Sequence, residues 1–423
     1  NLLTRVARPG EQRFRMLETL REYAREALAG DESAPQVHAG HAALYLARAE
    51  AAEAQLGGPQ QQHWLAVLGD EHDNIRAALQ WAIDHDDTPI ALRLAGALVR
   101  FWDVRGFLTE GRFWLESALA LPRNGVAAAV LLRALNAAAT LARRQSDLAH
   151  SRALFEQALA LSRAAGERWW ESIVLNGLAL VLRREGQLEQ AAALFEQSLA
   201  VCRAVGNHQG AAAAIGNLGS IATLQGHTAR AIDIQHQGLE LARQQQNPRE
   251  IAESLNNLAT AYHAAGDWER ADELQRESLE LYRSLGDRYG MALVEYNLAD
   301  RARAWGRLEQ ARTWCHHSLR TYDEIGEKAG VVECIELAAC IAVRDNRADW
   351  AAQLLSAMDE QRVLLGAPRT TAEQADAALV LEVARSALGD ALFGVAQSSG
   401  RHMALHDAAE QVLAYSAPPS HVA

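Results

Sequence analysis

The chain has 423 residues, of which 49% are hydrophobic, and a formal net charge of −12. This length exceeds a single compact core and indicates several domains or a repeat array, and the hydrophobic content excludes a disordered protein. The negative charge makes nucleic acid an unfavourable partner for most of the surface, because phosphate groups would be repelled.

Residue usage favours helices over strands. Ala and Leu, which lose little side-chain entropy in a helix, dominate a chain that has only 9 Pro. The 4 Cys form no CxxC pair, which fits free thiols in a reducing compartment, so we expect a cytoplasmic protein. No apolar stretch approaches the roughly 20 residues of a membrane span, and no signal peptide precedes the first expected helix. Because the chain begins at Asn1 rather than Met, we expect it to be a piece of a longer protein.

Residues 1–30 do not follow the pattern of the rest of the chain. Leu2-Leu3 and residues 12–17 are predicted as two short strands around Arg8-Pro9-Gly10, and residues 18–28 as a helix. The stretch RFRMLETLREYAREAL resembles the tail of the winged-helix domain that follows the nucleotide-binding domain in STAND signalling ATPases. These are large bacterial regulators related to the MalT, AfsR and LuxR-type activators. The resemblance implies a partial winged-helix fragment that packs against the nucleotide-binding domain. A DNA contact is the alternative for its six arginines, at positions 5, 8, 13, 15, 21 and 25.

The next segments also resemble those regulators. Residues 63–85 (HWLAVLGDEHDNIRAALQWAIDH) and 91–119 (ALRLAGALVRFWDVRGFLTEGRFWLESAL) are similar to the segments that open their sensor region. We assign residues 36–87 to a degenerate helical linker repeat. The run from Glu71 to Asn74 contains residue types used in acid–base chemistry, but we interpret it as a helix start with Asp73 or Asn74 as the cap.

From residue 88 to residue 366 the sequence repeats with a period of 40 residues, in seven copies. Short connections begin at Gly106, Ser146, Gly186, Gly226, Gly266, Gly306 and Asn346, and a small residue follows each at Gly111, Ser151, Ala191, Ala231, Ala271, Ala311 and Ala351. In the copy around Gly266, Leu255, Leu258 and Tyr262 lie on one face of a helix A. Ala271 and Leu274 lie on one face of a helix B, and the small side chain of Ala271 lets helix B approach helix A closely. Since no single pair can bury both faces, neighbouring pairs must stack into a solenoid.

These positions resemble the tetratricopeptide repeat. Its order of large residue, Leu, small residue, aromatic residue, Gly/Asp turn, Ala and small-Leu is matched by Leu255, Leu258, Ala259, Tyr262, Gly266, Ala271 and Ser278-Leu279. The period of 40 rather than about 34 implies longer helices, as in the variants found in kinesin light chains and bacterial peptide receptors. A Gly-rich link replaces the usual late Pro, at Gly166, Gly206, Gly286 and Gly326.

The predicted fold is therefore all-α. It is a tetratricopeptide-like, right-handed superhelical solenoid of helix pairs, preceded by the partial winged-helix fragment, and we expect an elongated, curved particle. Residues 379–390 and 400–414 resemble the C-terminal capping helices of the same regulators, so we assign residues 370–415 to capping helices. Residues 416–423 are predicted to be a disordered tail. In relatives a LuxR-type helix-turn-helix can follow at this point, and this sequence contains none.

A candidate partner groove is predicted on the helices A. Asn217, Asn257 and Asn297 recur at intervals of 40 residues, and Asn136 and Asn176 sit one position earlier in their copies. The tetratricopeptide resemblance places them on the concave side. A row of Asn amides, each with two donors and an acceptor, can bind an extended peptide backbone without reading its sequence, as relatives among peptide receptors and kinesin light chains do. The alternative is that each Asn braces the backbone of the preceding repeat.

Other polar residues further along the same helices complete the candidate groove. They are Arg143, Arg144, Arg183, Arg184, Thr260, His263, Tyr296, Asp300 and Arg303. The arginines could bind a carboxylate or a phosphate, or form a solvated face. Of Trp169 and Trp170, we expect one in the core and the other as an exposed anchor.

The sequence lacks the signatures of common catalytic sites. Its one lysine, Lys328, is not part of a Gly-Lys-Ser/Thr phosphate-binding loop, and neither GxSxG nor HExxH occurs. Cys315-His316-His317 and the pair His402/His406 contain metal-ligating residue types. However, adjacent helical residues point about 100° apart and the pair has no third ligand, so we interpret them as helix surface. We expect no enzymatic activity, metal or cofactor in this chain, with ATP bound only by an upstream domain.

The resemblance implies a function. The chain would be the sensor and interaction arm of a STAND-type transcriptional regulator. A peptide, protein or small ligand in the concave groove would relieve its clamp on the upstream nucleotide-binding domain. Two alternatives stay open: a generic tetratricopeptide scaffold that assembles proteins, and the C-terminal arm of a multidomain cyclase or kinase.

Overall fold

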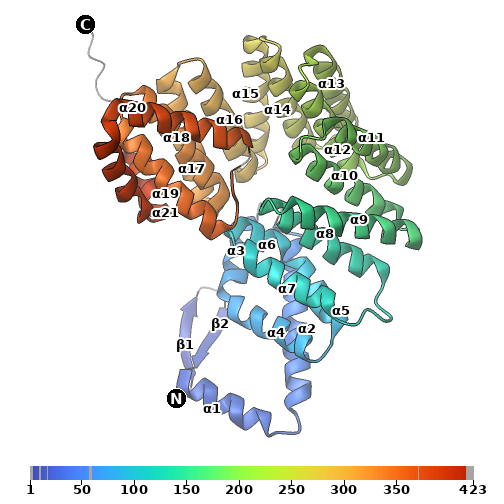
Figure 1. Cartoon of the computed structure of the whole chain (residues 1–423). Helices are drawn as coiled ribbons and strands as arrows, with labels where there is room; N and C mark the ends of the chain where they lie inside the picture. Colours follow the sequence, from blue (N-terminus) through green and yellow to red (C-terminus); the bar gives the residue numbers. More distant parts are fainter. Residues whose placement is uncertain (1–2, 9–10, 17, 57–59, 370, 416–423) are drawn as a thin grey trace.

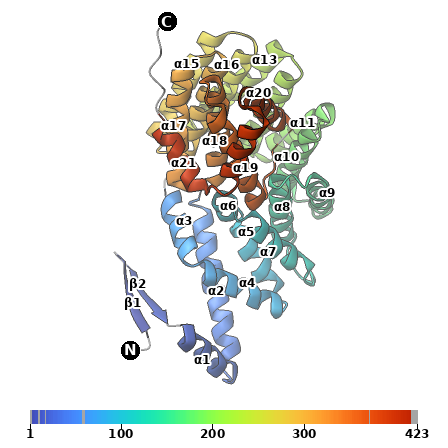
Figure 2. The same cartoon turned by 60° about the vertical axis from the view of Figure 1, so that its left-hand side comes forward.

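A computed structural model describes residues 3–8, 11–16, 18–56, 60–369 and 371–415. Within them a two-stranded sheet precedes 21 helices (Figure 1). Strands β1 (Leu3–Arg8) and β2 (Glu11–Met16) pair antiparallel, with Leu3 opposite Met16, and α1 (Glu18–Ala29) follows. The two strands and the helix form as predicted, and they stand apart from the packed helices (Figure 2). A hairpin and one helix do not define a winged helix, and the side chains of the six arginines lie outside the described part.

Three helices lead into the solenoid: α2 (Ala34–Glu53), α3 (Gln61–Asp70) and α4 (His72–Asp84). The predicted cap is wrong, because Asp73 and Asn74 lie inside α4 and Glu71 is the residue before it. The buried Glu71 carboxylate instead accepts hydrogen bonds from Tyr45 Oη at 2.8 Å, Arg48 Nη1 at 2.9 Å and Asn74 Nδ2 at 2.6 Å. It therefore ties α2 to the start of α4.

The repeats follow as antiparallel helix pairs. Their helices are α5 (Thr88–Ala97), α6 (Val99–Arg105), α7 (Leu108–Ala120), α8 (Ala128–Arg144), α9 (Leu148–Ala165), α10 (Arg168–Arg184), α11 (Leu188–Val205), α12 (His208–Leu224), α13 (Thr228–Gln244), α14 (Pro248–Ala264), α15 (Trp268–Ser284), α16 (Arg288–Ala304), α17 (Leu308–Ile325), α18 (Lys328–Arg344) and α19 (Ala348–Leu365). Helix A of the first copy is broken at Leu98 into α5 and α6. The predicted connections adopt positive φ, including the non-glycine Ser146 and Asn346, as expected where a helix ends in a left-handed residue.

Small residues set the close approach of the two helices in a pair. Ala271 is fully buried, as are its equivalents in the other copies. In the first copy this residue is Gly111, where an added Cβ would lie 2.7 Å from both Leu141 Cδ1 and Trp102 Cε3. The bulk of Trp102 therefore requires glycine at this crossing.

Buried serines on helix B join three of the pairs internally. Ser198, Ser278 and Ser318 donate hydrogen bonds to the backbone carbonyls of Ser172, Ala252 and Ala292, at 2.8, 2.6 and 2.8 Å. Each bond spans 26 residues, from helix B to the preceding helix A. A hydroxyl at this position satisfies its own hydrogen-bonding need in an otherwise apolar interface.

The solenoid curls until its two ends meet, whereas we expected an elongated, curved particle. Gln62 Nε2 donates to the carbonyl of Glu324 at 2.7 Å, and the Lys328 ammonium lies 5.6 Å from the centre of the Phe107 ring. Ala367 packs against both of the large hydrophobic cores, one in each half of the chain. Figure 1 shows the resulting ring, in which α3 and α6 return to the side of α17 and α18. We call this contact between α3–α8 and α16–α19 the closure seam.

Two further helices cover the last repeat, α20 (Thr371–Arg401) and α21 (Leu405–Ala414). Helix α20 packs along α19 and is kinked at Gly389, where φ is 74° and ψ is 161°. The predicted tail, residues 416–423, lies outside the described residues. Across the described part of the chain, no helix has both the length and the apolar character needed to cross a membrane.

Candidate functional site

The even-numbered helices α8, α10, α12 and α14 form the inner wall of the ring, and their odd-numbered partners lie outside (Figure 1). The predicted asparagines lie on these inner helices and on α16, and all five are partly buried. The candidate groove is therefore the inner wall of the ring.

The asparagines form pairs between neighbouring inner helices. Asn217 Nδ2 donates to Asn176 Oδ1 at 3.4 Å, and Asn297 Nδ2 donates to Asn256 Oδ1 at 3.3 Å. Arg183 Nη1 also donates to Asn217 Oδ1, at 3.2 Å. These bonds join side chains that are 41 residues apart. Asn217 and Asn297 therefore brace the preceding repeat through its asparagine side chain, whereas we had considered a bond to its backbone. Sequence reasoning missed Asn256. It occupies the same position in its repeat as Asn136 and Asn176, which is one residue before the position that Asn217 occupies in its own repeat.

Asn257 and Asn136 are placed differently. Gly216 occupies the place that an asparagine takes in other copies, and a Cβ added there would lie 3.0 Å from Asn257 Nδ2. The amide of Asn257 therefore fills the space over Gly216. The backbone carbonyl of Asn136 accepts a hydrogen bond from the hydroxyl of Thr140 at 2.7 Å.

The four predicted arginines gather where α8 and α10 end. Arg144 Nη2 lies 3.0 Å from Asp103 Oδ2, and Arg184 Nη1 donates to the carbonyl of Arg143 at 3.1 Å. Burial, with the nearby charges of Arg144 and Arg184, lowers the pKa of Arg143 to about 10. Of the described residues, Asp103 alone forms an ion pair with this cluster, which therefore carries an excess of positive charge.

The remaining predicted residues lie further round the wall. Arg303 is ion-paired to Asp300 at 2.7 Å, and the hydroxyl of Thr260 donates to the carbonyl of Asn256 at 3.1 Å. Burial lowers the pKa of His263, whose ring lies 5.7 Å from that of Trp305, and raises the pKa of Tyr296 well above its ordinary value. The predicted residues are therefore spread along the wall and do not converge on one point.

A cavity lies in the closure seam, and its empty volume of about 640 Å³ includes the solvent space at its opening. We call it the seam pocket. It is lined by Asp103, Gly106, Leu108, Arg144 and Arg184 from the first half of the chain and by Ala329, Val332, Glu333, Arg362, Leu365, Ala367, Pro368 and Glu373 from the second half. Of the predicted groove residues, Arg144 and Arg184 contribute to it. Sequence reasoning missed the rest, because the two halves meet only through the closure of the ring.

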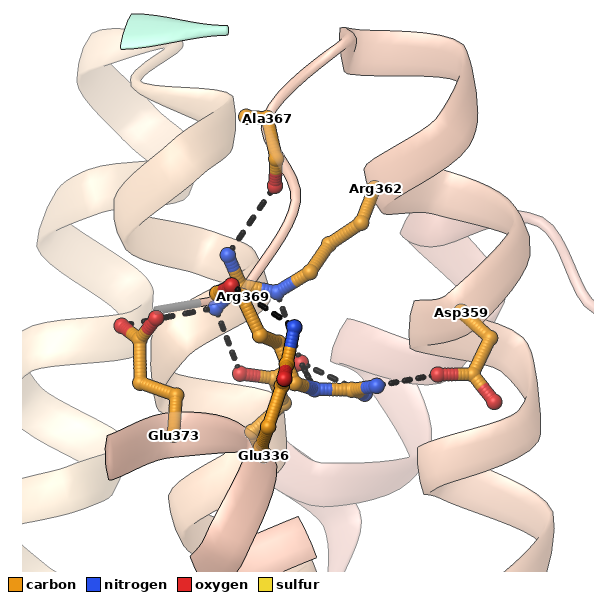
Figure 3. A network of polar contacts seen from close by, with 7 residues as sticks. Glu336, Asp359, Arg362, Ala367, Arg369 and Glu373 are labelled. Carbon is orange, nitrogen blue, oxygen red and sulfur yellow. Dashed lines mark hydrogen bonds and ion pairs between the residues drawn. The ribbon is translucent and has the colours of Figure 1, made fainter. Parts of the chain in front are cut away.

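An ion-pair network, shown in Figure 3, borders the seam pocket through the lining residues Arg362, Ala367 and Glu373. Arg362 donates to both oxygens of Glu336, at 2.9 and 2.7 Å, and to the carbonyl of Ala367 at 3.1 Å. Arg369 is paired with Glu336 at 2.8 Å and with Asp359, and Glu373 lies 3.7 Å from Arg362. The network fixes the connection between α19 and α20 against α18, and so holds that side of the pocket in place.

The other residues singled out from the sequence have structural surroundings. Cys315 is buried, its Sγ lies 3.3 Å from the carbonyl of Cys334, and burial raises its pKa to about 12. His406 pairs with Glu410 at 3.4 Å. Among the described residues, no group of three His, Cys, Asp or Glu is arranged to hold a metal ion. Trp170 packs against the core, and Trp169 is 48% exposed.

A buried carboxyl on α16 gives a prediction for pH dependence. Glu295 is 4% exposed, its Oε2 has no hydrogen-bond partner among the described residues, and burial raises its pKa to about 7. The folded chain therefore holds this proton more tightly than the unfolded chain, so the stabilising contribution is complete below the ordinary pKa of 4.5 and is lost as pH rises through 7. We expect wild type to lose on the order of 3 kcal/mol relative to Glu295→Gln between acidic and mildly alkaline pH, measured by denaturant unfolding. The exposed Glu382→Gln is the control, and an equal pH dependence of wild type and Glu295→Gln would contradict the prediction.

Comparison with known proteins defines the class of the repeats. The tetratricopeptide-repeat family model matches residues 170–244 and residues 250–324. Among solved structures, a Rap protein complexed with competence and sporulation factor superposes with a TM-score of 0.53 at 12% identity, over 83% of this chain and 99% of that chain. The apo form of RapI matches at a TM-score of 0.49 and 12% identity, over 60% of this chain and 90% of that chain. The chain thus contains tetratricopeptide repeats, and the Rap complex shares its fold.

Sequence relatives identify the kind of protein that carries a related segment. Proteins of Mycobacterium tuberculosis and Mycobacterium bovis, provisionally named HTH-type transcriptional regulators, are 39% identical over 132 residues. The match covers 30% of this chain and 14% of each regulator. The chain is therefore partly homologous to these regulators, and the matched segment is about a seventh of their length.

Proposed function

We propose that this chain is the sensor and interaction arm of a STAND-type transcriptional regulator of the cytoplasm. It binds a peptide, protein or small ligand on the inner wall of its ring and controls an upstream nucleotide-binding domain. It is not itself an enzyme, and ATP binds in the upstream domain. Residues 1–30 are the tail of the winged-helix domain that joins the two parts.

The observation that carries the proposal is the partial homology to the mycobacterial regulators. A tetratricopeptide array alone is a generic binding scaffold, because function lies in sites and not in folds. Homology at 39% identity to a segment of proteins named as transcriptional regulators favours a regulatory role over a general assembly role. The hairpin and α1, which stand apart from the ring, offer a natural connection to an upstream domain (Figure 2).

The inner wall supports the binding part of the proposal. It carries amide groups whose hydrogen-bonding capacity exceeds the bonds they make, since each Asn offers two donors and an acceptor. It also carries the positive cluster around Arg143, where the Nε atom is buried without a hydrogen-bond partner. These groups suit the backbone and carboxylate groups of a peptide or protein segment.

The test starts from the coding sequence upstream of Asn1, where a phosphate-binding loop supports the proposal and a cyclase or kinase domain supports the alternative. In the full-length protein, deleting residues 88–415 is expected to raise basal ATP hydrolysis severalfold, because the arm restrains the nucleotide-binding domain. The matched control is the full-length protein with Leu258→Ala, which weakens the arm without removing it. Unchanged hydrolysis after the deletion would exclude the restraint and leave the scaffold function.

A further inference from the structure

The charges that line the seam pocket cancel in number. Three cations, Arg144, Arg184 and Arg362, face three anions, Asp103, Glu333 and Glu373. Arg144 is paired with Asp103 at 3.0 Å, and Arg362 lies 3.7 Å from Glu373 while it also donates to Glu336 and to the carbonyl of Ala367. Two of the three pairs are thus internal to the protein, and Arg184 and Glu333 are left.

Arg184 and Glu333 are the two charged lining groups without an ion pair among the described residues. Arg184 is exposed and uses one nitrogen, Nη1, on the carbonyl of Arg143. Glu333 is half-buried and lines the pocket together with the apolar residues Val332 and Leu365, and no described group lies within hydrogen-bond or ion-pair distance of its carboxylate. A half-buried charge without a partner is costly, so this site gains when a ligand supplies the opposite charge.

We propose that the seam pocket binds a small zwitterion with an apolar body, namely a free amino acid or a dipeptide. Its ammonium group pairs with Glu333 and its carboxylate with Arg184, while its side chains lie on Leu108, Val332 and Leu365. A ligand with net charge is disfavoured because the lining charges sum to zero.

Binding at this place would also hold the ring closed. Arg184 belongs to the first half of the chain and Glu333 to the second, so one ligand bridges the seam. The seam is otherwise held by polar contacts, such as the Gln62 bond to Glu324 and the Arg100 guanidinium 5.4 Å from the Tyr289 ring, and by the apolar packing of Ala367 against both cores. A ligand that binds only the closed ring shifts the population toward it. Only the use of this closure in signalling rests on the proposed function; the binding itself does not.

The pH dependence of binding follows from the surroundings of Glu333. The pKa of Glu333 is raised to about 7, chiefly by burial and further by the negative charges of Glu373 and Glu336. The positive charges of Arg362 and Arg144 lower the pKa but do not offset the burial. The carboxylate of Glu333 is ionised only at a pH above this pKa, whereas the ligand ammonium stays charged. Affinity for a zwitterion should therefore rise between pH 6 and 8, and Glu333→Gln should remove this rise.

The experiment is calorimetry and thermal-shift measurement on the whole chain, with the common amino acids and their dipeptides as probes. We expect at least one apolar zwitterion to bind, and its N-acetylated and C-amidated analogues to bind at least roughly tenfold more weakly. Arg184→Gln and Glu333→Gln should each weaken binding to a similar degree. Arg276→Gln and Glu382→Gln, which change exposed charges on α15 and α20, should leave it unchanged. Hydrogen exchange of residues 103–108 and 366–369 should slow together when the probe binds.

Three outcomes overturn the proposal. One is that no probe binds at millimolar concentration. Another is that the acetylated and amidated analogues bind as well as the parent probe. The third is that both pocket variants, shown to be folded by circular dichroism, bind like wild type. The two proposals can fail separately. If a zwitterion binds as expected but the deletion of residues 88–415 leaves ATP hydrolysis unchanged, the seam pocket stands and the proposed function is refuted.

Discussion

Replacing Leu258 by Ala is expected to lower the free energy of unfolding by roughly 2–5 kcal/mol. Leu258 is 1% exposed and packs in a small core with Leu239, Leu255, Ala271 and Leu274. The surrounding helices are held by neighbours on both sides, so they can collapse only partly into the cavity that the substitution leaves. Chemical denaturation measures the loss. The control is Leu224→Ala, at a leucine that is 63% exposed, and it should change stability little.

The reverse substitution tests the same face from the other side. Ala271 is fully buried at the crossing of α14 and α15, so Ala271→Leu should force the helices apart and cost roughly 1–3 kcal/mol. Ala264→Leu, at an exposed position near the end of α14, is the matched control. If Leu258→Ala and Ala271→Leu both melt like wild type, the assignment of the buried face is wrong.

Local and periodic features could be predicted from the sequence. The recurrence of glycine, small residue and leucine at a spacing of 40 specified the helix pairs, because each position has the same neighbours in every copy. The left-handed turns at Gly186 and Gly266 follow from the freedom of glycine at positive φ. The burial of Ala271 and Leu258 follows from helical periodicity alone.

The closure of the ring could not be predicted in this way. Curvature accumulates from a small rotation between successive repeats, and no single residue sets it. The contacts that close it, between Gln62 and Glu324 and between Lys328 and Phe107, join residues more than 200 positions apart with no sequence pattern in common. The partnerless Glu333 therefore looks like an ordinary helix-surface glutamate until the fold places it in the seam pocket.

The asparagine row shows where a periodic signal misleads. The spacing of 40 residues suggested one row, Asn217, Asn257 and Asn297, with equivalent roles. The structure instead joins residues 41 apart, because the neighbouring helix is offset by one position at the point of contact. Asn256, which lies outside the expected row, is consequently a hydrogen-bonding partner of Asn297.

Replacing Asn217, Asn257 and Asn297 together by Ala is expected to weaken binding of the inner-wall partner by roughly one to three orders of magnitude. Each change removes about one or two neutral hydrogen bonds to the partner, worth roughly 0.5–1.5 kcal/mol net, and about 1.4 kcal/mol corresponds to a factor of ten in affinity. Stability should fall less than in Leu258→Ala, because the three inter-repeat bonds lost are long, at 3.4, 3.3 and 3.2 Å. Partner affinity and melting temperature are measured on the same variant, with the partner first captured on the wild-type chain.

The matched control for this experiment is Asn256→Ala, at a residue outside the predicted groove. It breaks the inter-repeat bond to Asn297 from the other side and leaves Asn217, Asn257 and Asn297 in place. If the row binds the partner, the control loses stability but keeps its affinity. If the asparagines only brace neighbouring repeats, both variants lose stability, and the folded fraction of the triple variant binds the partner as wild type does. The site would then lie elsewhere on the inner wall, with the arginines that end α8 and α10 as the next residues to replace.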